Sequence, residues 1–455
     1  MNIVIFGNAP LPFEGKYPVT APGGRTWQIL VTAADALARA MPQSVTLRLV
    51  ALDDTPRHEN VPNEIAIKCT EGRVFRATYL PLPYEKFILP EQSCAAAGMP
   101  LPDKIAGVIG CASAQPYSTA AAFAARCGAP LWIDVFGDPL AEIQTQAQTS
   151  DGDAKAAEVQ QVHVWKLLLD ALLQGDRFST LSSRQRFALL GQLGCAGRLN
   201  RKTADESMVS SIPYGIVPQE TAVAASFSQE NLRTTVTLMW NGSFNTWMDV
   251  KTLTAGLTMA MRQEPRLRLM VVGGRVAGYS EGAYDEFVKN IQVAGLQGSV
   301  QLLDWQPFES MQQLYHLADI GLSIDRPSFE AATGSRTRIV HFMAAGIPVI
   351  TTNLTELTAE LNEHGLIATF DCGNSQQLCD AILRMAANLD QTRELGKKGQ
   401  TYVYERFNAF EVGRSFARWV ISPQFAPDKN PPSEPAEADT NELLSHWTKV
   451  RATLG

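Results

Sequence analysis

The sequence predicts an α/β protein with two doubly wound parallel-sheet domains that face each other across a cleft, followed by a C-terminal helical tail. Three observations lead to this fold class. Short apolar runs alternate with amphipathic stretches in both halves of the chain, a polar and irregular segment at residues 217–234 separates the halves, and the same rhythm then restarts. Apolar strands that alternate with helices are typical of parallel sheets covered on both faces. The 455 residues are enough for several domains.

Residues 1–216 are predicted to form the N-terminal domain. Strands are expected where short apolar runs end at turn-forming residues, and helices where apolar residues recur at helical spacing. The expected strands are residues 2–6, 45–52, 107–110, 130–135 and 178–181. The expected helices are residues 26–40, 118–127 and most of 159–194. The stretches 8–22 and 53–104 match no motif.

The same criteria predict a second domain at residues 217–404. Its expected strands are residues 235–240, 267–272, 300–303, 320–324 and 348–352. Its expected helices are residues 249–262, 284–293, 310–317 and 336–345. Open α/β sheets bind ligands at the carboxyl ends of their strands, so two facing sheets predict a binding cleft between the domains.

Three segments are expected after the second sheet. A helix at about residues 405–421 is expected to pack back on the N-terminal domain. Closely spaced prolines among polar residues predict an extended linker at 423–438. A tail helix is expected at 439–455, because Asp439 and Glu442 have the spacing of a helix cap. Its apolar stripe consists of Leu443, Trp447, Val450 and Leu454. Such a stripe needs a groove, on this chain, on a protein partner or on a second copy in a dimer.

Composition and charge limit the function classes. Lys and Arg number 39 against 46 Asp and Glu, and the net charge of −7 lacks the general positive field that attracts nucleic acid. Seven scattered cysteines without a C-x-x-C pair predict free thiols rather than a disulfide framework or a zinc site. The absence of a basic leader and of a long apolar run predicts a cytoplasmic protein. The basic cluster of Arg198, Arg201 and Lys202 leaves two readings open: a contact with anionic lipid at the inner membrane face, or a solvated helix end.

The most informative stretch combines a glycine-containing loop, a helix, a Gly-Ile-Pro turn and a strand. Gly334 and Ser335 lead into the helix start, where backbone N–H groups and the helix dipole favour an anion. Arg336 and Arg338 lie beside that start, and guanidinium forks match phosphate oxygens. His341 follows on the same helix, within reach of a hydroxyl group. The alternative is that both arginines are solvated and the glycine only ends a loop.

This stretch resembles the donor-binding region of glycosyltransferase family 4, whose members have the GT-B architecture of two Rossmann-like domains. The resemblance covers nearly the whole chain up to about Val420. The other matching motifs are Gly23-Gly24-Arg25, Tyr214-Gly215-Ile216, Trp240-Asn241-Gly242-Ser243, Val271-Val272-Gly273-Gly274 and residues 343–349. The resemblance implies a GT-B fold and a donor site that includes Gly23, Gly24, Gly242 and Gly274.

The chain departs from the family at the residues that usually hold the donor. The family's two glutamates in an E-x7-E arrangement correspond to Thr333 and His341 here, and Glu330 is the expected substitute for the first. The resemblance therefore implies that His341 lies at the donor and that Glu330 takes part in catalysis.

The usual phosphate anchors of the family are also replaced. Its arginine and lysine after the first strand of the second domain correspond to Ser243 and Met248. Arg336 and Arg338 are the expected substitutes, and Arg275 is another candidate. Ser243 itself is expected at the donor site.

On the acceptor side, the family's histidine after the fifth strand corresponds to Phe136. Acceptor activation is then expected from Asp138, with Asp134 as second choice. The alternative for Asp134 is a structural carboxylate at a strand end.

A segment from Gly242 to Trp247 resembles a divergent subgroup of the family that also has an Arg-Thr-Arg helix start. The resemblance implies that Asn245 contacts a phosphate or a sugar hydroxyl, and it places Trp305 and Gln306 at the nucleotide base. Trp247 is interpreted as a core residue rather than a ligand contact.

The expected function is that of a metal-independent, retaining glycosyltransferase that uses a nucleotide diphosphate sugar, with UDP or dTDP as the nucleotide. Asp138, Arg336 and Glu330 are the expected catalytic residues. No metal is expected, and Asp151-Gly152-Asp153 is interpreted as a polar connector. The acceptor stays open between a glycan, a lipid-linked saccharide, a protein and a small molecule.

Three other functions stay open at this point. A catalytically silent GT-B scaffold fits the missing glutamates and anchors. A sugar-nucleotide epimerase has a similar architecture, but no clear acid/base pair is present. An NAD(P)-dependent oxidoreductase is disfavoured because no G-x-G-x-x-G follows a strand.

Overall fold

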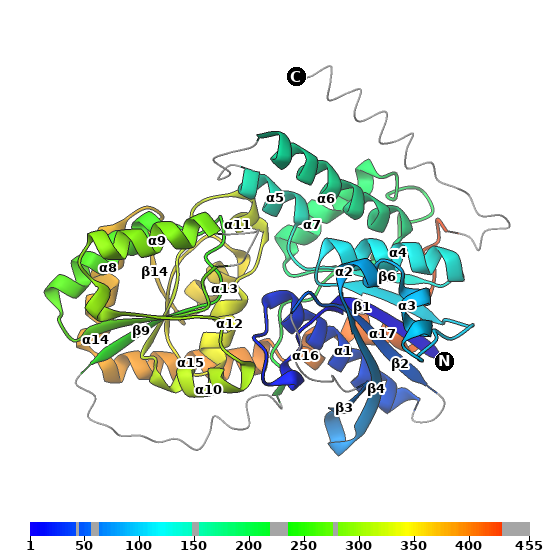
Figure 1. Ribbon diagram of the computed structural model, residues 1–455, viewed down its shortest axis with the longest axis horizontal. Coiled ribbons are helices and arrows are strands. Elements are labelled where there is room, and N and C mark those ends of the chain that lie inside the picture. Colours follow the sequence, from blue (N-terminus) through cyan, green and yellow to red (C-terminus); the bar gives the residue numbers. More distant parts are fainter. Residues whose placement is uncertain (42–44, 56–62, 148–153, 219–234, 276–280, 430–455) are drawn as a thin grey trace.

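The computed structural model contains two open sheets, one in each half of the chain, with helices packed against them (Figure 1). It describes residues 1–41, 45–55, 63–147, 154–218, 235–275 and 281–429. The predicted α/β fold with two parallel-sheet domains is confirmed.

The N-terminal sheet has eight strands in the order β3-β4-β2-β1-β5-β6-β7-β8. All neighbouring strands are parallel except β3, which runs antiparallel to β4. The strands are β1 (Asn2–Asn8), β2 (Thr46–Leu52), β3 (Glu64–Lys68), β4 (Val74–Leu82), β5 (Gly107–Cys111), β6 (Leu131–Val135), β7 (Arg177–Thr180) and β8 (Val209–Ser211). The helices are α1 (Ala21–Ala40), α2 (Tyr84–Phe87), α3 (Pro90–Ala96), α4 (Ala114–Cys127), α5 (Pro139–Ala147), α6 (Ala154–Gln174) and α7 (Ser183–Cys195).

Each face of this sheet has its own apolar core. Successive side chains of a strand point to opposite faces, so Ile3 and Ile5 of β1 join the cluster under α1, whereas Val4 and Phe6 join the cluster under α4 and α6. Burial on both faces explains why β1 is an uninterrupted apolar run.

Two strands lie in residues 53–104, where the sequence analysis expects no element. In β3 the polar and apolar residues alternate, and only Ile65 and Ile67 turn toward the core. An edge strand with one buried face needs only this short alternation, which is a weaker signal than the long apolar run of a central strand.

The second sheet has six parallel strands in the order β11-β10-β9-β12-β13-β14. The strands are β9 (Val236–Asn241), β10 (Leu267–Val272), β11 (Val300–Leu303), β12 (Ile320–Ser323), β13 (Val349–Thr352) and β14 (Ala368–Phe370). The helices are α8 (Val250–Gln263), α9 (Glu281–Val293), α10 (Phe308–Leu317), α11 (Phe329–Thr333), α12 (Thr337–Ala344), α13 (Glu356–Glu363), α14 (Ser375–Ala387) and α15 (Leu389–Arg406).

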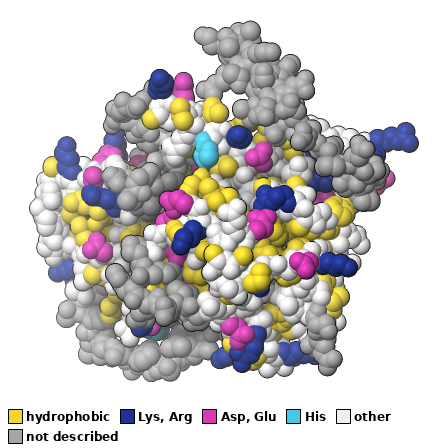
Figure 2. Space-filling model, turned by 45° about the vertical axis from the view of Figure 1, so that its right-hand side comes forward, with side chains coloured by type: hydrophobic (Ala, Val, Ile, Leu, Met, Phe, Trp, Pro, Cys, Tyr) yellow, Lys and Arg dark blue, Asp and Glu magenta, His cyan; other side chains and the backbone are white. Residues whose placement is uncertain are grey.

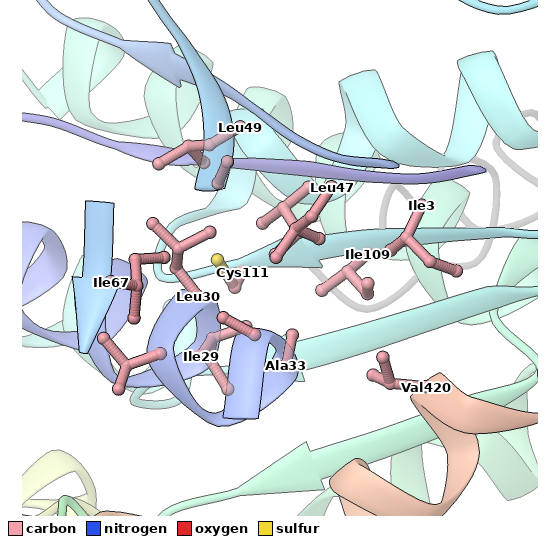
Figure 3. Close-up of a cluster of buried hydrophobic side chains, with 14 of the residues drawn as sticks. Ile3, Ile29, Leu30, Ala33, Leu47, Leu49, Ile67, Ile109, Cys111 and Val420 are labelled. Atoms are coloured by element: carbon pink, nitrogen blue, oxygen red, sulfur yellow. The ribbon is translucent and has the colours of Figure 1, made fainter. Parts of the chain in front are cut away.

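After α15 the chain returns to the N-terminal domain through α16 (Ala409–Val412) and α17 (Arg414–Ile421). The ring centres of Phe416 and Trp419 lie 5.3 Å and 5.6 Å from that of Trp132 on β6. Val420 points into the same apolar cluster as Ile3, Ala33 and Ile109 (Figure 3). In Figure 1 these last helices, coloured orange, lie beside the blue first elements of the chain. The N-terminal core therefore needs both ends of the described chain.

Residues 423–429 pack on the N-terminal domain, which corrects the expectation of an extended linker from residue 423. Ala426 is buried in the core, and its N–H donates to the Asp176 carboxylate. Asp428 forms an ion pair with Arg198 at 2.6 Å. Arg198 is thus neither a solvated helix end nor available to a lipid. The rest of the expected linker and the tail helix at 439–455 lie outside the described residues.

The described surface carries charges of both signs. On the face in Figure 2, acidic and basic side chains are interspersed with apolar ones. Within the described part of the chain, no helix combines the length and the apolar character that crossing a membrane requires.

We predict that Arg198→Ala lowers the free energy of unfolding by about 3–5 kcal/mol, because it leaves a buried carboxylate of Asp428 without its cation. The substitution also removes hydrogen bonds to the carbonyl groups of Leu172 and Gly175. Denaturant unfolding measures the change. The control is Arg126→Ala, whose exposed pair with Glu91 contributes less than about 1 kcal/mol. Equal, small losses in both variants would contradict the structural role of residues 423–429.

Candidate active site

A cleft of about 600 Å³ lies between the carboxyl ends of the two sheets. Its N-terminal wall comes from the start of α1, the loops after β5 and β6, and the helices α5 and α6. Its other wall comes from the loops after β9 and β11, from α10, and from the region between α11 and α12. Because both sheets present the ends at which α/β proteins bind ligands, this cleft is the candidate active site.

Hydrogen bonds across the cleft hold the domains together. The Glu356 carboxylate at the start of α13 accepts the backbone N–H groups of Ser183 and Arg184 at the start of α7, each at 2.9 Å. At another point the N–H of Phe308 donates to the carbonyl of Tyr17 at 3.0 Å. A carboxylate at a helix start is favoured by the helix dipole. The two walls of the cleft are therefore directly connected.

The Arg336 side chain forms two ion pairs inside the second domain. Its Nε lies 2.6 Å from Asp325 Oδ2, and its Nη2 lies 2.8 Å from Glu330 Oε2. Only 5% of the Arg336 side chain is exposed. Burial disfavours the charged guanidinium, but the two carboxylates outweigh this effect and raise the pKa of Arg336 above its ordinary value. Burial in turn raises the pKa of Glu330, against the effect of Arg336. Arg336 and Glu330, both predicted to be catalytic, thus belong to a buried ion-pair group of two carboxylates and one guanidinium.

Arg338, two residues further along, has neutral partners. Its Nη2 donates to the Ser243 carbonyl at 2.8 Å, and its Nη1 lies 3.7 Å from the Met248 sulfur. Its guanidinium carbon lies 4.0 Å from the centre of the Trp240 ring. The Nε has no hydrogen-bond partner among the described residues. Burial lowers the pKa of Arg338 to about 9, against the opposing effect of the Asp325 carboxylate, so the group stays charged at neutral pH in a place where water stabilises it poorly.

Two glycines let these arginines approach the loops. A Cβ on Gly242, whose φ is +100°, would lie 3.3 Å from Arg338 Nη2. A Cβ on Gly334 would lie 2.7 Å from Glu330 Oε1. The glycines that the resemblance assigns to ligand contact also serve packing of the site itself.

His341 lines the cleft next to Tyr214, with ring centres 5.3 Å apart. Burial lowers the pKa of His341 to about 4. The imidazole is therefore neutral at physiological pH and can exchange hydrogen bonds with a hydroxyl group, but it adds no positive charge.

Most predicted donor-site residues line the cleft, with Gly24 on the N-terminal wall and the others on the wall of the second domain. These residues are Gly24, Gly242, Ser243, Asn245, Trp305, Gln306, Glu330, Gly334, Ser335, Arg336, Arg338 and His341. Trp247, interpreted from the sequence as a core residue, is 7% exposed and also lines the cleft. Gly274 lies outside this wall and packs against the Tyr284 ring. The alternative anchor Arg275 is exposed and pairs with Asp285.

Asp138 has a different place from the one predicted. Its Oδ1 accepts the N–H groups of Leu140 and Ala141, so it caps the start of α5, and its Oδ2 accepts from Gln192. The side chain is buried and does not line the cleft. This geometry contradicts acceptor activation by Asp138. The Asp-Pro pair is the sequence signal for a helix start that explains it.

Asp134, the second choice, is also a structural residue. Its carboxylate pairs with the Arg25 guanidinium at 2.6 Å and accepts from Ser179, with both charged side chains fully buried. The structural alternative that the sequence analysis left open is therefore the one that the structure favours.

Gly23 and Gly24 lie in the first turn of α1, not in the loop that the resemblance implies. A Cβ on Gly23 would lie 2.2 Å from the Pro10 carbonyl oxygen, and one on Gly24 would lie 2.5 Å from Tyr214 Oη. Close packing of the helix start against two segments requires both glycines. Gly24 lines the cleft, whereas Gly23 does not.

Sequence reasoning missed Glu142, which contributes a carboxylate to the N-terminal wall. Glu142 lies four residues after Asp138, on the first turns of α5. A Cβ on Gly137, whose φ is +80°, would lie 2.3 Å from Glu142 Oε1, so the carboxylate lies over this glycine at the end of β6. The sequence signal that could have found Glu142 is the Asp138-Pro139 pair, which marks a helix start directly after β6. A residue on the first turns of that helix lies near the carboxyl end of the strand.

Among the described residues, no group of three or more His, Cys, Asp or Glu side chains is placed to hold a metal ion. Asp151 and Asp153 lie outside the described residues.

The architecture matches that of solved GT-B enzymes. Sucrose-phosphate synthase from Thermosynechococcus elongatus is 19% identical, covers 92% of this chain and 98% of its own, and gives a TM-score of 0.62. The α,α-trehalose-phosphate synthase (UDP-forming) from Burkholderia vietnamiensis is 10% identical, with coverage of 93% and 97% and a TM-score of 0.59. HepE from Anabaena, solved in complex with UDP-glucose, is 15% identical, with coverage of 92% and 98% and a TM-score of 0.57. The fold of this chain is therefore GT-B.

The second domain identifies the class of protein. Residues 235–388 match the family "Glycosyl transferases group 1", a stretch that contains β9 to β14 and the arginines of α12. Together with the GT-B fold, this match makes the chain a glycosyltransferase. No curated protein sequence matches the chain. The assignment to family 4 stays a prediction.

We predict that Arg336→Met destabilises the protein by about 3–5 kcal/mol, since it leaves two buried carboxylates uncompensated. Denaturant unfolding checks this value, with Arg275→Met as the control because the Arg275–Asp285 pair is exposed. An Arg336→Met variant as stable as the parent protein would instead favour a direct role of Arg336 at the donor.

The depressed pKa of His341 predicts a pH effect on stability. Below the ordinary pKa of 6.5 the unfolded chain binds a proton at His341, while the folded protein resists protonation down to about pH 4. The folded state therefore loses stability as pH falls through this window. Between pH 7 and pH 5 we expect the melting temperature of His341→Gln to fall less than that of the parent protein. Removal of the exposed His364 in His364→Gln should not change this pH dependence. Parallel curves for all three proteins would contradict the prediction.

Proposed function

We propose that the protein is a metal-independent, retaining glycosyltransferase whose donor is a nucleotide diphosphate sugar, with UDP or dTDP as the nucleotide. The observation that carries this proposal is Arg338, a buried cation at the cleft whose hydrogen-bond partners are all neutral. A guanidinium in this state gains more from a diphosphate than one already paired with carboxylates. The UDP-glucose complex of HepE, a GT-B protein of the same architecture, supports a uridine nucleotide.

The surroundings of Arg338 suit the diphosphate. The start of α12 has no side-chain cap, so the helix dipole and the backbone N–H groups at this end add to the positive field. Gly242 and Ser243 lie directly under the guanidinium. We assign the phosphate anchor to Arg338 and the task of holding the helix start to Arg336.

The reaction follows from this assignment. The bond between the anomeric carbon and the diphosphate oxygen breaks, and the acceptor oxygen forms a new bond to the anomeric carbon on the same face of the sugar. The acceptor proton passes to the departing phosphate oxygen. Arg338 and the start of α12 stabilise the negative charge that develops on the leaving group, which is electrostatic catalysis by groups already in position. The connected walls of the cleft limit access of water, and thus hydrolysis.

We predict that Arg338→Met weakens binding of the donor nucleotide about tenfold to a hundredfold, which corresponds to a lost charge-assisted hydrogen bond of about 1.5–3 kcal/mol. Calorimetric titration with UDP and dTDP, and melting curves with UDP-, dTDP-, GDP- and ADP-sugars, measure this effect. A ligand that binds only the folded protein raises its melting temperature. EDTA should leave the affinity unchanged.

Arg275→Met is the matched control, because it removes an exposed arginine of the same domain. Equal affinities in Arg338→Met and the parent protein would refute the assignment of Arg338. No shift with any nucleotide sugar, in a folded protein, would favour a catalytically silent GT-B scaffold. A product with inverted anomeric configuration in its NMR spectrum would exclude retention.

A further inference from the structure

We propose that Tyr315 is a second anchor for the donor diphosphate, next to Arg338, and that the Asn241 side chain positions its hydroxyl group. This inference rests on the proposed function and deepens it, since it adds a residue to the same donor site. The observation behind it is the polar pair of Tyr315 and Asn241, which lies at the cleft and which the donor assignment above does not use.

Tyr315 and Asn241 meet because of the face on which β9 places its last side chain. Successive side chains of a strand point to opposite faces of the sheet. Asn241 therefore lies on the same face as Met239, which belongs to the apolar cluster that includes the buried residues of α12. Tyr315, near the end of α10, packs against this cluster, with its ring centre 6.1 Å from that of Phe342 on α12. Both polar side chains line the cleft.

The Tyr315 hydroxyl group has a hydrogen atom to donate. The Asn241 side-chain amide donates to Tyr315 Oη at 2.7 Å, and this is the one hydrogen bond that the hydroxyl group makes within the described part of the chain. A tyrosine hydroxyl group can accept a hydrogen bond and donate one as well. Burial raises the pKa of Tyr315 above its ordinary value, although the Arg338 cation opposes this effect. The phenol is therefore neutral at physiological pH and keeps its proton.

The hydroxyl group and the Arg338 guanidinium both lie at the carboxyl end of β9. Asn241, which binds the hydroxyl group, is followed directly by Gly242, where a Cβ would lie 3.3 Å from Arg338 Nη2. The Arg338 Nε is buried and has no hydrogen-bond partner among the described residues. Two donor groups that lack an acceptor, one of them charged, thus lie at the same end of the strand. An anion with several oxygen atoms can accept from both, and the diphosphate is the anion that the proposed donor supplies.

Calorimetric titration of Tyr315→Phe with UDP, inorganic pyrophosphate and uridine tests the inference. The substitution keeps the ring and removes the hydroxyl group, so UDP and pyrophosphate should each bind about tenfold more weakly, as expected for a lost hydrogen bond to a charged group. Uridine has no phosphate and should bind as it does to the parent protein. Unchanged affinities for UDP and pyrophosphate, or an equal loss for uridine, would overturn the inference.

Tyr402→Phe is the matched control. It removes a tyrosine hydroxyl group of the same domain that binds the Glu360 carboxylate outside the cleft. The affinities for UDP, pyrophosphate and uridine should therefore stay at the parent values. A loss of UDP affinity in Tyr402→Phe as large as that in Tyr315→Phe would contradict a contact between Tyr315 and the diphosphate.

A second variant tests the positioning role of Asn241. Asn241→Ala leaves the Tyr315 hydroxyl group without its partner, so UDP should bind about twofold to tenfold more weakly. If Asn241 acts through Tyr315, the double variant Asn241→Ala/Tyr315→Phe should bind UDP as weakly as Tyr315→Phe alone. A further loss in the double variant would mean that Asn241 contacts the ligand itself, and its positioning role would be wrong.

The ligands also separate this inference from the proposed function. If UDP binds and Arg338→Met weakens it but Tyr315→Phe does not, the donor assignment stands and the anchor at Tyr315 is wrong. If neither UDP nor dTDP binds but pyrophosphate does, and Tyr315→Phe weakens it, the proposed nucleotide donor fails and the anion site at Tyr315 stands. If none of the three ligands binds the parent protein, both proposals fail.

Discussion

The double ion pair of Arg336 with Asp325 and Glu330 is the interaction on which the donor side of the cleft depends. Asp325 follows β12, Glu330 lies on α11, and Arg336 precedes the first residue of α12. Three consecutive elements are thus joined through one guanidinium. Because all three groups are buried, removal of Arg336 would leave two uncompensated carboxylates, and the loop that carries Gly334 has little freedom. This fixed loop determines where α12 starts, and hence where Arg338 points.

The N-terminal domain uses a similar arrangement. Asp134 on β6 is neutralised by Arg25 from α1, which also donates to the carbonyl group of Ile212. In both domains a carboxylate at the end of a sheet is paired with a buried arginine from a helix start, so this arginine is held in place by the protein itself. Arg338 differs from both arginines, because its hydrogen-bond partners are neutral. A sequence offers no sign of this difference, because an arginine bound to carboxylates and one bound to neutral groups are the same residue type.

The architecture could be predicted from the sequence because a parallel strand buried on both faces is an uninterrupted run of apolar residues. The runs at β1, β9 and β10 were found, and the two-domain α/β fold is confirmed. Edge strand β3 was missed because one buried face leaves a short signal. Residues 423–429 were interpreted as a linker because of their closely spaced prolines. In the structure, the buried Ala426 and the ion pair of Arg198 with Asp428 hold this segment on the N-terminal domain. Such long-range partners have no local pattern.

The sequence could predict which segments line the candidate site, but not the roles of the individual residues. The glycine loop and the arginines of α12, found from the sequence, line the cleft, since helix starts and glycines are local features. Their role at the donor stays a prediction. Which arginine is neutralised depends on Asp325 and Glu330, whose side chains meet Arg336 only in the folded chain. Asp138 was mistaken for an active carboxylate because the Asp-Pro pair was not interpreted as a helix cap. The direct role of Arg336 and Glu330 in catalysis stays a prediction.

On the wall of the second domain, the Arg338 guanidinium is buried, its hydrogen-bond partners are neutral, and the start of α12 has no side-chain cap. Both features favour an anion at this wall. Charges interact more strongly where the dielectric constant is low, so a buried guanidinium attracts an anion more strongly than one on an open surface. Under the proposed function, the diphosphate therefore lies against this wall, where the charge that develops on the leaving group is stabilised.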